Sequence, residues 1–201
     1  MKSYVLISGG LGNQMFQYAF LLSLKAKGYD AVMDLMPYQW EKAHNGYELD
    51  RVFGISENMN CSSFHKYLYV FLKKIKSKYI LSDYLDYYDD ETLKNRLFYD
   101  GFWQIEKYFH DLEDEVRKAF TFKNIDSRNI EVVNQMRKEN AVSVHFRRGD
   151  YLTIPRLMVC DDEYYKKSIS YIKENIPSPM FYVFSNDIEW SDGFMRELHV
   201  P

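Results

Sequence analysis

The fold class is decided by VSVHFRRGDY, residues 142–151, in which an apolar, β-forming run leads directly into charged residues and a glycine. Residues 141–146 are apolar apart from Ser143 and His145, which is typical of a buried strand in a parallel sheet. Open α/β sheets bind their ligands at the carboxyl ends of such strands. We therefore expect the residues that follow Phe146 to lie where a ligand binds.

Two adjacent arginines, Arg147 and Arg148, predict an anion site at this strand end, because a guanidinium group offers a charged, planar fork of donors that matches phosphate oxygens. The alternative is a surface loop with solvated arginines, one of them paired with Asp150. His145 is either a contact to a nucleotide or its ribose, or a satisfied core histidine. Asp150 either orients Arg148 or acts as a base. We favour orientation, because neighbouring arginines lower the pKa of a carboxyl group.

A glycine-rich loop near the N-terminus shows a second strand-to-helix pattern. Residues 4–8 read as a short buried strand, GGLGNQ follows at residues 9–14, and an apolar helical run stops at Gly28. Asn13 is a suitable N-cap, and the N–H groups of a first helical turn attract anions. However, Met15 stands where the dinucleotide motif has a third glycine or alanine, and no Lys-Ser or Lys-Thr pair completes a P-loop. Taken alone, the loop fits a plain strand-to-helix turn equally well.

Together the two segments resemble glycosyltransferase family 11, the α-1,2-fucosyltransferases, and in particular its bacterial members. The resemblance rests on GGLGNQMFQYAF at residues 9–20 and on HFRRGDY at residues 145–151, which contains a His-x-Arg-Arg-x-Asp motif. Further similar stretches are YELDRVF at 47–53, GFWQIEKYF at 101–109, YYKK at 164–167 and YVFSNDIEW at 182–190. The resemblance therefore runs over essentially the whole chain.

The resemblance implies an inverting galactoside 2-α-L-fucosyltransferase, which moves L-fucose from GDP-β-L-fucose to the 2-hydroxyl of a β-galactoside in a surface glycan. It assigns the β-phosphate of the donor to the paired arginines. No Asp-x-Asp motif lies at an expected strand end, so we expect a nucleotide sugar and a glycan acceptor but no metal and no cofactor. The predicted catalytic residues are Arg147 and Asp150. The predicted donor-binding residues are Gly10, Gly12, Asn13, Gln14, His145, Arg147 and Arg148.

Alternating strands and helices indicate an α/β protein. We expect strands over residues 4–8, 30–35, 141–146 and 180–185, and helices over residues 14–27, 64–79, 104–120, 127–138 and 161–175. The resemblance implies two Rossmann-like domains of the GT-B type with the active site in the cleft between them. Residues 1–125 would form an N-terminal α/β domain on the acceptor side, with the glycine-rich loop, and residues 126–201 a partial donor-binding domain.

Family members continue well past the region equivalent to residues 182–190, whereas this sequence stops at Pro201. We therefore expect an incomplete C-terminal domain, and the alternative function is a catalytically weak or inactive GDP-sugar-binding module. Residues 181–184 read as a continuous buried strand that expects neighbours on both sides, so uncovered edges would favour self-association. A Rossmann oxidoreductase is a third alternative, with Asp34 as the only candidate for the ribose-binding acid.

Composition narrows the class of protein further. A chain of 201 residues with 46% hydrophobic and 17% aromatic residues buries a core, and a net charge of −3 gives no global attraction for nucleic acid. The two cysteines lack the spacing of a metal or disulfide site, and no apolar run approaches the roughly 18 residues of a membrane helix. We expect a cytoplasmic protein in a reducing compartment.

Residues 64–78 combine an apolar, aromatic run with a lysine-rich end. One interpretation is peripheral contact with the inner face of a membrane, near lipid-linked acceptors. The other, which we favour, is an ordinary amphipathic helix whose basic end is solvated and is stabilised by the helix dipole.

Overall fold

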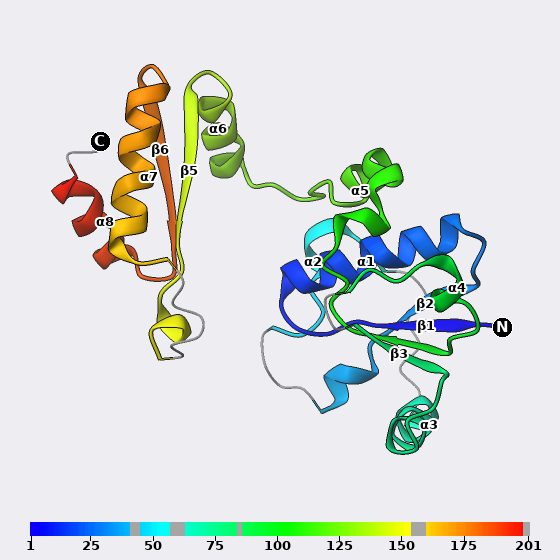
Figure 1. Ribbon diagram of the computed structural model, residues 1–201. Helices are drawn as coiled ribbons and strands as arrows, with labels where there is room; N and C mark the ends of the chain where they lie inside the picture. The colour runs from blue at the N-terminus through cyan, green and yellow to red at the C-terminus, as the bar shows by residue number, and fades with distance from the viewer. Residues whose placement is uncertain (41–44, 57–62, 84–85, 154–159, 199–201) are drawn as a thin grey trace. The chain divides into compact units, whose positions relative to one another are not determined.

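The computed structural model describes residues 1–40, 45–56, 63–83, 86–153 and 160–198. The chain divides into two compact units, residues 1–124 and residues 125–201, which are shown in Figure 1. Both units are built of helices and parallel strands, so the α/β fold class is confirmed. The arrangement as two Rossmann-like domains of the GT-B type, and the assignment of acceptor and donor to them, stay predictions.

The sheet of the first unit has four parallel strands in the order β2-β1-β4-β3. Their bounds are Ser3–Leu6 for β1, Ala31–Asp34 for β2, Ile80–Ser82 for β3 and Phe98–Asp100 for β4. The sequence predicted β1 and β2 to within two residues. It missed β3 and β4, because a strand of three residues is too short to display a period.

The helices of the first unit connect and flank these strands (Figure 1). They are α1 Leu11–Ala26, η1 Met36–Gln39, α2 Leu49–Phe53, α3 Ser63–Lys74, α4 Asp90–Leu93, η2 Glu106–Tyr108, η3 His110–Leu112 and α5 Glu113–Ala119. The helix predicted over residues 64–79 ends early, because Lys76 adopts a positive φ of 48°. The helix predicted over residues 104–120 is wrong in its first half. There Tyr108 is buried and its hydroxyl donates to the Asp86 carbonyl at 3.1 Å, within short 3-10 turns.

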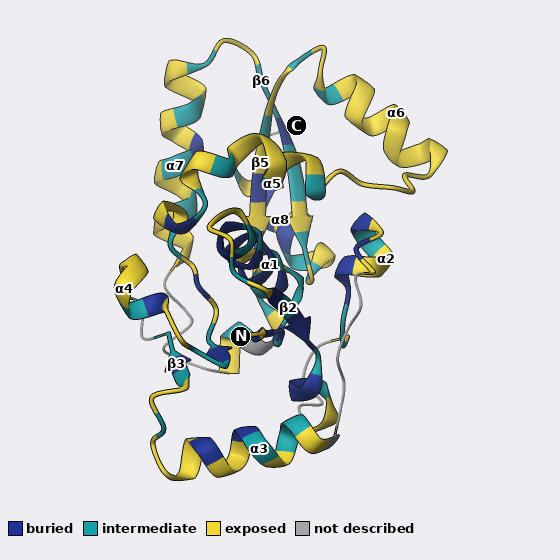
Figure 2. Cartoon of the chain, turned by 90° about the vertical axis from the view of Figure 1, so that its right-hand side faces the viewer, coloured by how far each residue is buried: buried dark blue, intermediate teal, exposed yellow. Residues whose placement is uncertain are grey.

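The core of the first unit forms where α1 packs against the sheet. Phe20 and Leu24 on α1 are fully buried together with Val5 on β1, and Figure 2 marks α1 as largely buried. The ring of Phe20 stacks on Trp103 with centroids 4.1 Å apart and planes 6° apart. Burying one side chain of this size contributes about 1.5–3 kcal/mol, so α1 is firmly anchored and the loop before it has a fixed base.

The second unit has two parallel strands. Its elements are α6 Ser127–Met136, β5 Asn140–Phe146, η4 Gly149–Thr153, α7 Asp162–Asn175, β6 Pro179–Ser185 and α8 Ile188–Glu197. The predicted strands and helices of this unit lie within two residues of these bounds. The strands pair in register from Asn140 and Pro179 to Phe146 and Ser185.

One face of this sheet carries the core of the second unit, together with α7 and α8. The buried residues of this core are Val144, Phe146, Ile169, Phe181, Phe194 and Met195. Alternate residues point to the opposite face, where Phe184 is 49% exposed. The prediction that residues 141–146 and 181–184 form continuously buried strands is therefore wrong, and the period of two explains why only alternate positions are covered.

Candidate functional site

The segments that follow β5 and β6 lie side by side at the carboxyl edge of the second sheet. The two parallel strands end in register at Phe146 and Ser185, and the Ser185 hydroxyl donates to the Phe146 carbonyl at 3.0 Å. The residues one and two positions further along each chain therefore meet. In this way the sequence segment of Arg148 comes to lie beside Asp187, 39 positions away.

Arg148 is held by three contacts from the segment after β6. Its backbone N–H donates to the Asn186 side-chain carbonyl at 2.9 Å, and its Nε donates to Asp187 Oδ2 at 3.1 Å. Its guanidinium carbon lies 3.7 Å from the centroid of the Trp190 ring, a cation–π contact. The Arg148 side chain is only 22% exposed. The guanidinium group is thus oriented by the fold before any ligand arrives.

Asp187 joins this arginine to the start of α8. Its Oδ1 accepts the backbone N–H of Trp190 at 3.3 Å as the N-cap, while its Oδ2 accepts Arg148. Gly149 makes the close approach of the two segments possible. A Cβ at this glycine would lie 2.6 Å from Asn186 Nδ2, and its φ of +52° lies in the region that favours glycine. The cluster of Arg148, Asn186, Asp187 and Trp190 is hereafter called the arginine cluster.

The other predicted residues of this segment are more exposed. Arg147 is exposed, with its guanidinium carbon 5.1 Å from the Tyr151 ring centroid. His145 is exposed too, so it is not a core histidine, and its contact with a nucleotide stays a prediction. The side chain of Asp150 lies outside the described residues, and its role also stays a prediction. The carboxylate that the structure shows on Arg148 is that of Asp187.

The glycine-rich loop of the first unit links β1 to α1. Helix α1 begins at Leu11, and Gly10 is its N-cap in an extended conformation, with φ −78° and ψ 173°. The prediction of Asn13 as the N-cap is wrong, because the helix starts as soon as the backbone leaves Gly10 and Asn13 falls in its first turn. The Asn13 side-chain carbonyl instead accepts the Gln104 amide at 2.8 Å.

Gln14 fixes this loop from inside. It is fully buried, and its Nε2 donates to the carbonyls of Gly9 at 3.0 Å and Gly46 at 2.9 Å. Its Oε1 accepts the backbone N–H of Glu48 at 2.8 Å. These three bonds engage both amide protons and the carbonyl of Gln14. Around Gly12, in contrast, a Cβ would meet no atom within 4 Å. Assignment of these residues to donor binding stays a prediction.

Sequence reasoning missed several residues that build these two junctions. Gln17, fully buried, accepts the Ser8 N–H at 3.0 Å and donates to the Gly101 carbonyl at 2.9 Å, which ties the glycine loop to the end of β4. Asp187 and Trp190 hold Arg148 from a distant segment. Parallel pairing of the two predicted strands at residues 141–146 and 180–185 was the available signal, because it brings their following residues to one edge.

Neither a metal cluster nor a membrane span is found in the described part of the chain. No three His, Cys, Asp or Glu side chains among the described residues gather where they could hold a metal ion. Among the same residues, no helix is both long and apolar enough to cross a membrane. Metal-independent transfer stays a prediction that needs its own experiment.

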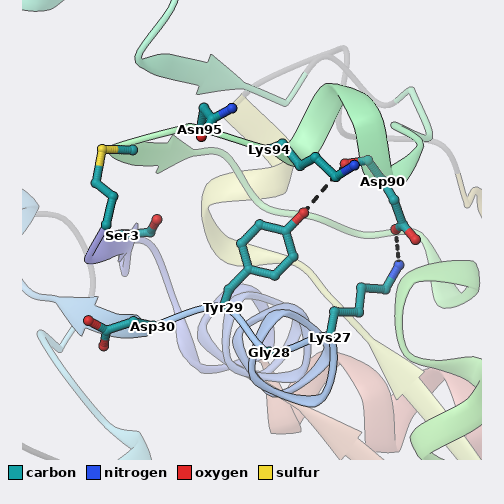
Figure 3. A pocket seen from close by; sticks show the side chains of 9 residues that line it. Ser3, Lys27, Gly28, Tyr29, Asp30, Asp90, Lys94 and Asn95 are labelled. Atoms are coloured by element: carbon teal, nitrogen blue, oxygen red, sulfur yellow. Dashed lines mark hydrogen bonds and ion pairs between the residues drawn. The ribbon is translucent and has the colours of Figure 1, made fainter.

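A cavity of about 360 Å³ lies at the amino edge of the first sheet, whereas the glycine-rich loop lies at the carboxyl edge of the same sheet (Figure 3). Lys27 forms an ion pair with Asp90 there, which raises the pKa of Lys27, and the Tyr29 hydroxyl donates to the Asp90 carbonyl at 3.4 Å. No predicted site residue lines this cavity. Since parallel sheets bind ligands at their carboxyl ends, we place the candidate site at the arginine cluster instead.

Comparisons with known proteins agree with the motifs. The family model described as glycosyl transferase family 11 matches residues 2–196. The chain is 33% identical over 214 residues to an alpha-1,2-colitosyltransferase of Escherichia coli, covering 96% of this chain and 71% of the relative. It is 27% identical over 239 residues to the Escherichia coli O-antigen biosynthesis glycosyltransferase WbnK, covering 94% and 74%. For the Mus musculus galactoside alpha-(1,2)-fucosyltransferase 2 the identity is 27% over 193 residues, covering 90% and 52%. No solved structure matches the chain.

Proposed function

The chain belongs to glycosyltransferase family 11, and we propose that it transfers L-fucose from GDP-β-L-fucose, with inversion, to the 2-hydroxyl of a β-galactoside in a surface glycan. Two kinds of relative support the position of the new bond, since one is named an alpha-1,2-colitosyltransferase and another a galactoside alpha-(1,2)-fucosyltransferase. A relative named for O-antigen biosynthesis supports the surface glycan as the destination of the sugar.

The observation that carries this proposal is the fixed guanidinium group of Arg148 next to Arg147. In a single displacement the acceptor hydroxyl oxygen forms a bond to the anomeric carbon and releases its proton to solvent, while the bond from that carbon to the diphosphate oxygen breaks. The electron pair leaves with the diphosphate, whose negative charge grows. Arg147 and Arg148 stabilise that charge, and a preorganised donor of this kind contributes about 2.7–4 kcal/mol to the transition state.

Other parts of the predicted site assist the donor in this proposal. His145 contacts the nucleotide from the carboxyl end of β5. In the first unit, Gly10, Gly12 and Asn13 offer backbone N–H groups at the start of α1, while Gln14 keeps their loop in shape.

Colitose is the second candidate sugar, and the 33% identity to a colitosyltransferase favours it. Colitose is fucose without the 3-hydroxyl. A pocket that hydrogen-bonds this hydroxyl discriminates against colitose by a factor of about 10⁴ or more, because its polar groups would be left unpaired. A pocket without that contact accepts both sugars.

The test is a comparison of initial rates with GDP-L-fucose and GDP-L-colitose on a β-galactoside, with the linkage of the product determined by NMR. We expect faster transfer of fucose and an α-1,2 bond. Preference for colitose would correct the donor, and a bond to another hydroxyl would refute the acceptor position. Nucleotide binding without any turnover would support the alternative of an inactive GDP-sugar-binding module.

A second experiment addresses the metal. Since two arginines neutralise the leaving diphosphate, we expect the rate in excess EDTA to stay within about twofold of the rate with Mn²⁺. Collapse of the rate on chelation and its return with Mn²⁺ would show that a metal, and not the arginine pair, carries the charge.

A further inference from the structure

Among the described residues, helix α3 packs against the first unit through one face. Tyr69 and Leu72 on this face are buried in a cluster with Phe98 on β4 and Met36 on η1. The ring centroids of Tyr69 and Phe98 lie 5.5 Å apart in an edge-on arrangement. These contacts fix which face of α3 points into the protein.

Two polar contacts hold the same face. His65 Nδ1 lies 2.9 Å from Asp34 Oδ2, and Asp34 is fully buried at the end of β2. One residue before the end of α3, Lys73 Nζ lies 2.9 Å from Asp100 Oδ2 at the end of β4. The rotation of α3 about its own axis is therefore set near both ends of the helix.

The opposite face of α3 exposes a continuous apolar stripe. Its residues are Phe64, Tyr67, Val70 and Phe71 on the helix and Ile75 directly after it, which are 68%, 73%, 52%, 58% and 56% exposed. The spacing of three and four residues aligns them along the helix. Figure 2 shows exposed residues alternating with buried ones along α3, as expected of a helix with one covered and one exposed face. Single exposed apolar residues are common on protein surfaces, but five aligned large ones mark an interaction surface.

The segment that carries this stripe has charges of one sign. Residues 63–82 contain no Asp or Glu, and their lysines are Lys66, Lys73, Lys74, Lys76 and Lys78. The whole chain, in contrast, has 29 acidic and 26 basic residues. A segment with five positive charges in a protein of net charge −3 points to a negatively charged partner surface.

Two further partly exposed aromatic residues lie near α3, outside the stripe. Trp40 is 44% exposed, and its ring lies nearly parallel to that of Tyr69 with centroids 6.5 Å apart. Lys66 Nζ lies 5.2 Å from the centre of the Trp40 ring. Tyr79 is 40% exposed, just after the lysine-rich end of the helix. Tryptophan, tyrosine and lysine with long apolar stems are the residues that settle at the boundary between lipid and water.

We propose that the exposed stripe of α3 docks on an anionic membrane surface, with the helix lying in the plane of the headgroups. The stripe enters the acyl boundary and the surrounding lysines contact lipid phosphates. A protein partner is less well matched, because the stripe offers no acidic residue to set the register of a specific interface. This surface belongs to a different element from the arginine cluster, so the proposal is independent of the donor and acceptor.

Co-sedimentation with vesicles tests the proposal. Wild-type protein is mixed with vesicles of phosphatidylcholine that contain about one-third phosphatidylglycerol, and with vesicles of phosphatidylcholine alone. We expect binding to the anionic vesicles, weakened by salt, and at least tenfold weaker binding to the neutral ones. Charge reversal by Lys74→Glu with Lys76→Glu should lower the partition coefficient more than about tenfold, since each lysine near an anionic surface contributes about fivefold.

Two matched triple variants test whether vesicle binding depends on the stripe or on any exposed apolar residues. Phe64→Ser, Tyr67→Ser and Phe71→Ser together should abolish sedimentation, whereas Ile130→Ser, Tyr164→Ser and Tyr171→Ser, at exposed positions on α6 and α7, should leave it unchanged. Circular dichroism confirms that both triple variants are folded. Absence of wild-type binding, or equal binding by the stripe variant, would overturn the proposal. A different result would also overturn it: light scattering shows that wild type is a dimer and the stripe variant a monomer, while neither protein binds vesicles.

Discussion

The segments after β1 and after β5, here called the first and second junction, have similar local topology but are held by different kinds of side chain. Each follows the carboxyl end of a parallel strand and each needs a glycine in the left-handed region, Gly9 with φ +73° and Gly149 with φ +52°. The first junction is held by Gln14 and Gln17, which are neutral and fully buried. The second is held by an arginine and a carboxylate that remain partly exposed, with Arg148 the less exposed of the two.

This difference follows from the free energy of burial. An amide whose hydrogen bonds are all satisfied can be buried at little net loss, whereas a charged group must keep solvent or a partner. The protein therefore uses buried amides where only the backbone has to be fixed. At the second junction, where we propose that the diphosphate binds, one carboxylate and one aromatic ring orient the charged group. By this reasoning the side chains of the first junction are structural and only its backbone N–H groups are offered to the donor, whereas the proposed chemistry belongs to the side chains of the second.

The largest expected effect separates the two junctions by activity. Arg148→Ala should lower the transfer rate about 10²–10³-fold, because the leaving diphosphate loses an oriented charge. Stability should fall by only about 1 kcal/mol, since the ion pair with Asp187 is partly solvated. Initial rates and thermal unfolding measure the two quantities.

Arg196→Ala is the matched control for this experiment. Arg196 lies on α8 and pairs with Asp192 at 2.8 Å, and its side chain is 78% exposed. Its removal should change neither rate nor stability beyond about twofold or 0.5 kcal/mol. If the two variants had equal rates, the arginine cluster would have no chemical role.

The next effect is on stability and belongs to the first junction. Gln14→Leu should lower the free energy of unfolding by about 2–3 kcal/mol, because the Gly46 carbonyl and the Glu48 N–H lose their buried partner. Denaturant unfolding measures this loss. Gln104→Leu, at an exposed amide, should cost less than about 0.5 kcal/mol. Unchanged stability of Gln14→Leu with weaker GDP binding would instead make Gln14 a donor contact and erase the contrast between the junctions.

A smaller expected effect tests whether the planar shape of the Arg147 guanidinium group matters for binding of GDP. Arg147→Lys keeps the charge but replaces a planar fork by a point charge, so affinity for GDP should fall about tenfold. Titration calorimetry measures the change. Unchanged affinity would mean that Arg147 acts only as a general positive charge, or not at all.

The sequence predicted the strand and the two arginines of the second junction but not the residues that orient Arg148. Sequence alone predicts the strand and the two arginines that follow it, Arg147 and Arg148, because the composition changes abruptly from apolar to charged after Phe146. The contact between Arg148 and Asp187 cannot be predicted from either segment alone, since it depends on the register of two strands 39 residues apart. Burial of the strands was overestimated for a related reason, because composition alone cannot tell one covered face from two.

The first junction shows the opposite balance. The strand, the glycines and the helix were predicted, and the structure agrees, but Asn13 was placed at the N-cap that Gly10 occupies. Buried partners of Gln14 come from residues 46 and 48, on a segment that no local pattern connects to the loop. Local propensity thus gives the elements, whereas the hydrogen bonds that fix a loop are set by tertiary packing.

The most direct test of the central claim is titration calorimetry of GDP, in buffer with EDTA, against wild type, Arg196→Ala and the double variant Arg147→Ala with Arg148→Ala. Two charge-assisted hydrogen bonds to a diphosphate are worth about 1.5–3 kcal/mol each. We therefore predict that wild type and Arg196→Ala bind GDP equally and that the folded double variant binds it more than about 100-fold more weakly. Equal affinity of the double variant and wild type would contradict the assignment of the diphosphate to the arginines after β5.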